Sequence, residues 1–114
     1  MTVTEITKIG KNAVNDENIL ILFGETVTPD LMDVSIVQKT IDSAPIALKE
    51  GGQLIFGDQS YKIKGVGPLT NENLNEIGHA TVFFQEEVGV IPNAIYVTPE
   101  KLPELEVGMK IIFQ

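Results

Sequence analysis

The chain contains a single histidine, His79, within the stretch NLNEIGHATVFF at residues 73–84. A neutral imidazole carries a lone pair on one ring nitrogen, and it is a competent nucleophile toward phosphorus when a neighbouring group fixes its tautomer. Thr81 would share one face of a strand with His79, so its hydroxyl could hydrogen-bond the ring. His79 is therefore a candidate phosphoryl acceptor. The alternative is a structural histidine that caps a short helix or bonds a backbone carbonyl, and the residues alone leave both open.

Few other residues could carry chemistry. The chain has no cysteine, which excludes disulfides and thiolate metal sites. The GVG stretch at residues 65–67 lacks the helix with Lys-Ser/Thr that completes a phosphate-binding loop. Glu86 and Glu87 are adjacent and would point to opposite faces of a strand, so they cannot act together as an acid–base pair. Glu104 and Glu106 lie near a glycine turn, where we expect them to be solvated.

Composition limits the class of protein and its partners. The 114 residues are 43% hydrophobic, which predicts one domain over residues 1–114. Sixteen acidic against eight basic residues give a net charge of −8. This balance argues against nucleic acid and against an anionic membrane surface, and leaves a basic protein partner or a neutral ligand. No segment approaches the roughly 18 apolar residues of a membrane span, and no signal-peptide core is present, so we expect a cytoplasmic protein.

The elements that must position these residues are mostly strands. Alternating or short apolar runs occur at residues 2–10, 18–23, 33–40, 54–56, 61–66, 80–85, 93–98 and 109–113. The run at 18–23 is continuous and is typical of a strand covered on both sides. The pattern predicts a mostly β fold, a small antiparallel β-barrel or sandwich of about eight short strands with one short helix.

That helix is expected to lie just before His79. Thr70 is a suitable N-cap, and Gly78 suits the position after the last turn. A second helical turn is indicated at residues 28–33, with Pro29 in its first turn. Exposed edge strands in an open barrel could also pair two chains, so a homodimer is compatible with the sequence.

Two segments of the chain resemble each other. Residues 47–57 align with residues 104–114, with Gly51 matching Gly108 and Phe56 matching Phe113. The shared unit is a polar turn around a glycine that leads into a strand. Such units recur in small β-barrels, so the likeness does not require a duplicated ancestor.

The chain also resembles a known family, the glucitol/sorbitol-specific IIA component of the bacterial phosphoenolpyruvate-dependent sugar phosphotransferase system (PTS). The most specific stretch is GVG followed by NLNEIGHATVFF. The likeness spans almost the whole chain, and it is carried by residues 6–10, 19–31, 52–67, 72–84 and 108–113.

The resemblance implies a small cytoplasmic phosphocarrier. In this family a phosphoryl group arrives from the histidine-containing carrier HPr, rests on a histidine of the IIA domain and passes to a IIB domain. The sugar is phosphorylated as the membrane component, IIC, imports it. The resemblance implies no metal and no organic cofactor.

The family's acceptor histidine has no counterpart in this chain. Laid onto the sequence, the acceptor position falls in DVSIVQKT, at or next to Gln38. An amide nitrogen is barely nucleophilic, because its lone pair is delocalised into the carbonyl. A glutamine keeps hydrogen-bonding capacity and size, so the pocket could still recognise a polar or phosphorylated group. Two hypotheses follow: a relay in which His79 takes part, or a binding or regulatory module that has lost phosphoryl transfer.

Overall fold

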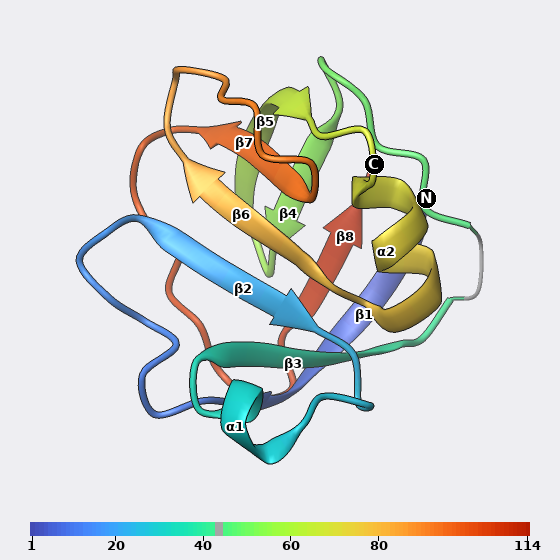
Figure 1. Cartoon of the computed structure of the whole chain (residues 1–114), viewed down its shortest axis with the longest axis vertical. Helices are drawn as coiled ribbons and strands as arrows, with labels where there is room; N and C mark the ends of the chain where they lie inside the picture. Colours follow the sequence, from blue (N-terminus) through green and yellow to red (C-terminus); the bar gives the residue numbers. More distant parts are fainter. Residues whose placement is uncertain (43–44) are drawn as a thin grey trace.

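The computed structural model describes residues 1–42 and 45–114, which form an eight-stranded barrel with two short helices (Figure 1). The elements in chain order are β1 (Thr2–Ile9), β2 (Ile19–Phe23), α1 (Pro29–Met32), β3 (Ser35–Thr40), β4 (Gln53–Phe56), β5 (Gln59–Val66), α2 (Thr70–Ile77), β6 (Ala80–Phe84), β7 (Ala94–Thr98) and β8 (Lys110–Phe113).

The strands close in the order β1-β3-β2-β6-β7-β5-β4-β8, with β8 pairing back onto β1. The predicted mostly β barrel of about eight strands is confirmed. It differs from an all-antiparallel barrel, because β2 pairs with β3 and β6 with β7 in parallel. Each of these pairs is joined by a crossover segment instead of a tight hairpin, as parallel pairing requires. Closure also leaves no edge strand among the described residues, so the edge pairing that made a homodimer compatible with the sequence is not available there.

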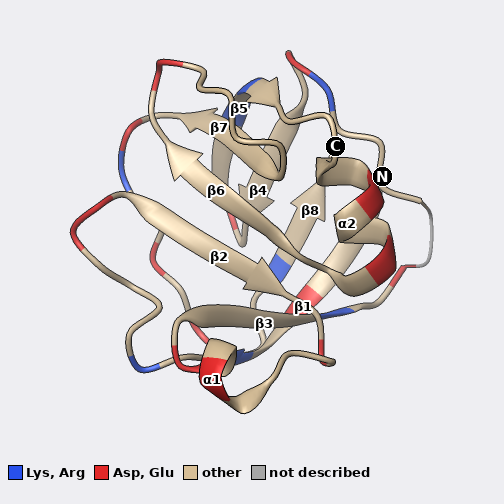
Figure 2. Cartoon of the chain, in the orientation of Figure 1, with Lys and Arg blue, Asp and Glu red and all other residues tan. Residues whose placement is uncertain are grey.

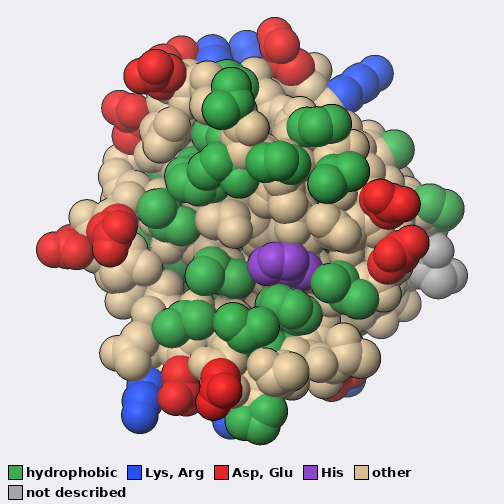
Figure 3. All heavy atoms as spheres, in the orientation of Figure 1, with side chains coloured by type: hydrophobic (Ala, Val, Ile, Leu, Met, Phe, Trp, Pro, Cys, Tyr) green, Lys and Arg blue, Asp and Glu red, His purple; other side chains and the backbone are tan. Residues whose placement is uncertain are grey.

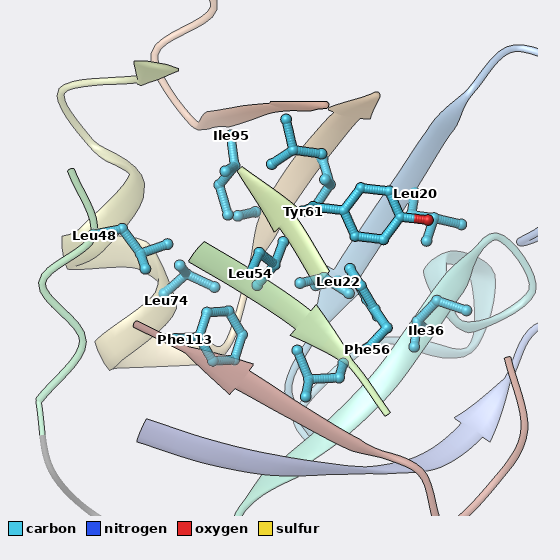
Figure 4. Packing of buried hydrophobic residues seen from close by; sticks show 14 of the residues in the cluster. Leu20, Leu22, Ile36, Leu48, Leu54, Phe56, Tyr61, Leu74, Ile95 and Phe113 are labelled. Atoms are coloured by element: carbon cyan, nitrogen blue, oxygen red, sulfur yellow. The ribbon is translucent and has the colours of Figure 1, made fainter. Parts of the chain in front are cut away.

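The core fills the inside of the barrel with large apolar side chains (Figure 4). Along β2, Leu20 and Leu22 point inward and are fully buried. The outward residues Ile19, Ile21 and Phe23 are only half-buried. The prediction that this strand is covered on both sides therefore holds for the inner face alone.

The barrel is built from two similar sets of four strands. A half-turn exchanges β1 with β5, β2 with β6, β3 with β7 and β8 with β4, and it preserves every pairing in the barrel order. Both parallel pairs are related in this way. A bulge interrupts β1 between Ile6 and Lys8, and a matching bulge interrupts β5 between Ile63 and Gly65. The fold therefore has internal pseudo-twofold symmetry.

The two segments that resemble each other in sequence obey this symmetry. Gly51 has a φ of 91° and precedes β4, and Gly108 has a φ of 94° and precedes β8. The Gly51 N–H donates to the Ile63 carbonyl, and the Gly108 N–H donates to the Ile6 carbonyl. Each glycine thus makes the same left-handed turn, which few other residues adopt without strain.

Helix α2 differs in one detail from its sequence signals. Thr70 is the first residue of the helix, and Leu69 occupies the N-cap position without a side-chain cap. The Thr70 hydroxyl instead donates to the Ala94 carbonyl at 2.9 Å and ties the helix to β7. Gly78 ends the helix with a φ of 67°, as predicted. The second helical turn is present as α1, which has Pro29 in its first turn.

Candidate functional site

Gln38 lies at one end of the barrel with both polar atoms of its amide hydrogen-bonded. The residue points inward from β3 and is 3% exposed. Its Oε1 accepts a hydrogen bond from the Thr4 hydroxyl of β1 at 2.6 Å. Its Nε2 donates to the Gly78 carbonyl at 3.1 Å, at the end of α2. The amide is therefore held in one orientation by β1 and by the turn between α2 and β6.

A pocket of about 320 Å³ opens above this amide and is called here the Gln38 pocket. Its charged residues are Glu25, Lys39 and Glu76. The remaining lining residues come from β1, the end of β3, the turn after β2, the end of α2 and the segment after β3: Thr4, Gly24, Thr26, Gln38, Thr40, Ile46, Leu74, Asn75, Ile77 and Gly78. The pocket is thus polar at its floor and weakly acidic at its mouth.

Two asparagines of α2 fix the segment after β3, which supplies Ile46 to the wall of the pocket. Asn75 Oδ1 accepts from the Ile46 N–H at 2.7 Å, and its Nδ2 donates to the Ile46 carbonyl at 2.9 Å. Asn71 makes the same pair of bonds with Leu48, at 2.8 and 3.0 Å. The extended segment at residues 45–49 is therefore fixed to the helix by side chains. Leu48 and Leu74 complete the contact by packing against each other (Figure 4).

The opposite end of the barrel has the same frame and no such polar floor. Ile6 pairs with Gln38, and its counterpart Ile63 pairs with Val97, so the symmetry places Val97 where the first half has Gln38. Leu54 and Ile111 occupy matching positions in the two similar segments. Thr4 pairs with Ile111 and Tyr61 pairs with Leu54, so Tyr61 is the counterpart of Thr4.

Tyr61 fills its end of the barrel with an aromatic ring. It packs edge-on against Phe56 and Phe84, at centroid distances of 5.9 and 5.0 Å, and its hydroxyl donates to the Lys101 carbonyl. Burial raises the pKa of Tyr61. The polar opening at Gln38 is thus a departure from the internal symmetry, and this departure marks the end of the barrel that carries the candidate site.

His79 does not line the Gln38 pocket. Ala80 and Val82 of β6 point into the barrel, whereas His79 and Thr81 lie on its outer side and are half-buried. The imidazole stacks on Phe23 with a centroid distance of 4.4 Å. The backbone joins the two candidate residues, since Gly78 accepts the Gln38 amide and directly precedes His79, but their side chains face different surfaces.

A backbone carbonyl fixes the tautomer of His79. Its Nδ1 lies 3.1 Å from the Leu22 carbonyl oxygen, which can only accept, so Nδ1 carries a proton. In the neutral ring the lone pair is then on Nε2. The Leu22 carbonyl provides this contact, and not the hydroxyl of Thr81, which the sequence offered as a possible partner of the ring. The ring is visible at the surface, among hydrophobic side chains (Figure 3).

Sequence reasoning missed several residues of this site. Thr4 gave no signal beyond its alternating position on a strand, and a backbone carbonyl such as that of Gly78 gives none. Asn71 and Asn75 offered a usable signal, since two asparagines four residues apart lie on one face of a helix.

Comparison with known proteins gives this architecture a family. The family model described as the PTS system glucitol/sorbitol-specific IIA component matches residues 1–112. This chain belongs to that family. The PTS glucitol/sorbitol-specific EIIA component of Escherichia coli K12 is 32% identical over 83 residues, which cover 71% of this chain and 67% of the relative. The protein of the same name from Shigella flexneri matches with the same identity and coverage.

A solved structure matches the whole barrel. The crystal structure of a PTS system IIA component from Enterococcus faecalis V583 shares 37% identity and a TM-score of 0.92, over 97% of this chain and 98% of that one. The resemblance inferred from the sequence is therefore confirmed for this IIA chain. Among its described residues, no helix is long and apolar enough to cross a membrane.

Proposed function

We propose that this chain acts in the cytoplasm as a glucitol/sorbitol-type IIA module that docks with relay partners but carries no phosphoryl group at position 38. The observation that carries this proposal is the Gln38 amide on the floor of the pocket, with Oε1 and Nε2 both engaged. An amide has no basic nitrogen lone pair to attack phosphorus. The partners implied by family membership are HPr and a glucitol-type IIB/IIC component.

Loss of the acceptor would also remove a charge switch. A phosphorylated histidine adds nearly two negative charges, so an active IIA domain alternates between two charge states. A module with Gln38 stays in the uncharged state of that position. This behaviour suits a regulatory or binding role in which the partner meets one constant surface.

A second candidate function is supported by the geometry of His79. With Nδ1–H donated to the Leu22 carbonyl, Nε2 holds the lone pair of a neutral ring. Nε2 would attack the phosphorus of a phosphohistidine on HPr that is protonated on its other ring nitrogen. A new N–P bond forms as the old one breaks, and the HPr imidazole leaves neutral with the bonding pair. His79 then carries the phosphoryl group on Nε2 and keeps its Nδ1 proton.

One experiment separates the two functions. The chain is incubated with phosphoenolpyruvate, the first enzyme of the relay and HPr, and acid-labile phosphoryl groups are counted by intact mass. We expect none on the wild-type chain and none on His79→Ala. One group on the wild-type chain that His79→Ala abolishes would replace the proposal with the His79 relay.

The variant Gln38→His tests whether a histidine restored at position 38 accepts a phosphoryl group. An imidazole at position 38 that donates one N–H to the Gly78 carbonyl would present the other nitrogen to the pocket with its lone pair. We therefore expect Gln38→His to gain one acid-labile group, and to keep it when His79→Ala is added. Thr40→His is the matched control, because it places an imidazole on the exposed wall of the same pocket. A folded Gln38→His chain that gains nothing would show that the pocket no longer meets HPr productively.

A further inference from the structure

The outer face of the β2–β6 pair has no charged side chain. Antiparallel sheets in soluble proteins commonly keep one face solvated and polar. Here the outward residues of the two neighbouring strands are apolar or neutral, and β2 and β6 carry no charge along their length (Figure 2). We call this surface the uncharged face and define it by its half-buried members Ile19, Ile21, Phe23, His79, Thr81 and Phe83.

The apolar surface continues beyond the two strands. Phe83 stacks on Tyr96 of β7 at 5.3 Å, and the Tyr96 hydroxyl accepts the Ile91 N–H. The loop between β6 and β7 therefore lies against this edge of the face, and it presents Val90 with 96% of its surface exposed. At the other edge Ile77 is 40% exposed and lines the mouth of the Gln38 pocket. The uncharged face thus adjoins the candidate site.

Acidic residues frame this surface. Both strands are bracketed along the chain by exposed carboxylates: Asp16 and Glu17 before β2, Glu25 after it, Glu76 before β6, and Glu86 and Glu87 after it. Figure 3 shows acidic side chains around the margin and hydrophobic side chains around the histidine at the centre. Lys64 pairs with Glu86 at 3.0 Å and offsets part of this charge. The remaining frame is strongly negative.

We propose that the uncharged face docks a relay protein whose contact surface has an apolar centre framed by Lys and Arg. Burial of the apolar centre would supply affinity, and the opposite charges of the two frames would supply orientation and a faster encounter. The same frame disfavours a second copy of this chain, because two acidic margins would meet, and it disfavours an anionic lipid surface. This inference rests on the proposed docking function and names the surface that performs it.

Binding measurements with HPr and, separately, with the glucitol-type IIB domain test the proposal. The chain labelled with ¹⁵N is titrated with each protein. We expect at least one of them to bind, with the largest amide shifts on β2 and β6, and with affinity that falls as salt is added. Ile21→Lys and Thr81→Lys each place an unpaired charge at the centre of the face, and we expect each to weaken binding about tenfold or more. Thr81→Lys keeps the test valid if Ile21→Lys fails to fold.

A matched variant controls for added charge. Val107 is 62% exposed and precedes β8, which lies across the barrel from β6. Val107→Lys should leave binding unchanged. Binding with shifts elsewhere, unaffected by Thr81→Lys, would overturn the uncharged face and leave the docking function standing. If neither HPr nor the IIB domain binds, the uncharged face and the proposed docking function are both overturned. A dimer of the chain alone that Thr81→Lys disrupts would assign the face to self-association and overturn the proposal.

Discussion

Asn75 exchanges two hydrogen bonds with the backbone of Ile46, and Asn71 repeats this exchange with Leu48. The match is a matter of spacing. Four residues of α-helix rise about 6 Å, and two residues of extended chain rise about 6.6 Å. The two asparagine side chains therefore take the place of a neighbouring strand. They hydrogen-bond the backbone N–H and carbonyl groups of Ile46 and Leu48.

Removal of one of these side chains should loosen the pocket wall. Asn75→Ala leaves the N–H and carbonyl of Ile46 without their partners, and we expect the free energy of unfolding to fall by about 1–3 kcal/mol. Urea denaturation measures this change. Asn73→Ala is the control on the same helix, because the Asn73 side chain makes no hydrogen bond among the described residues. An equal loss in both variants would refute the role given to Asn75.

The Thr4–Gln38 hydrogen bond should show strong coupling. Thr4→Val leaves the buried Oε1 of Gln38 unpaired, and we expect a loss of about 1–3 kcal/mol. Gln38→Leu removes that acceptor, so the double variant should lose less stability than the two single losses added together. The measurement is a double-mutant cycle by chemical denaturation. Additive losses would mean that the 2.6 Å contact contributes nothing specific.

The turn at Gly78 should resist any side chain. Its φ of 67° is left-handed, and a Cβ there would come within 2.8 Å of the Gly24 nitrogen. Gly51 has a similar left-handed φ of 91° and open space around it. Gly51→Ala therefore carries the backbone strain alone, about 1–3 kcal/mol, and Gly78→Ala should lose more. Thermal or urea unfolding of the two variants compares them directly, and equal losses would contradict the close approach.

Tyr61 should make stability depend on alkaline pH. Burial raises the pKa of Tyr61, so the folded chain keeps the phenol neutral after the unfolded chain has begun to ionise. The contribution is fully present below the ordinary tyrosine pKa of about 10 and is lost as the pH rises beyond it. Denaturation midpoints measured at rising alkaline pH should fall. In Tyr61→Phe this part of the pH dependence should be absent.

Glu5 should respond to Lys110 in the acidic range. The hydrogen bond and charge of Lys110, at 3.0 Å, lower the pKa of Glu5. A lowered pKa stabilises the fold above the usual glutamate range, and this contribution disappears as the pH falls through the folded value. Lys110→Gln should raise the pKa of Glu5 in an NMR titration, and added salt should do the same in the parent chain. The effect on stability is expected to be small, because the pair is at the surface.

Sequence patterns predicted the barrel better than they predicted the site. Period-two alternation at Thr2–Ile9 and the glycine turns fixed the strands, because both follow from local backbone geometry. The parallel pairing of β2 with β3 could not be seen, since it depends on how a crossover packs over the barrel. Thr70 looked like a helix cap and instead bonds β7, a long-range partner that no local pattern reveals.

The two candidate residues illustrate the same limit. Gln38 was found through its position in a family pattern, and the structure places it in a pocket. His79 was found as the one histidine of the chain. The sequence did not show which residues around it point into the barrel, because a shift of one residue exchanges the inner and outer faces of a strand. Its carbonyl partner on Leu22 lies 57 residues away in the chain.

The pseudo-twofold frame also bears on why the pocket exists. Tyr61 and Val97 seal one end of the barrel, so the frame does not need an opening at the other. The opening at the other end comes from two side chains, Thr4 and Gln38, which stand where Tyr61 and Val97 stand in the second half of the chain. The open end is thus a property of these two side chains and not of the barrel itself.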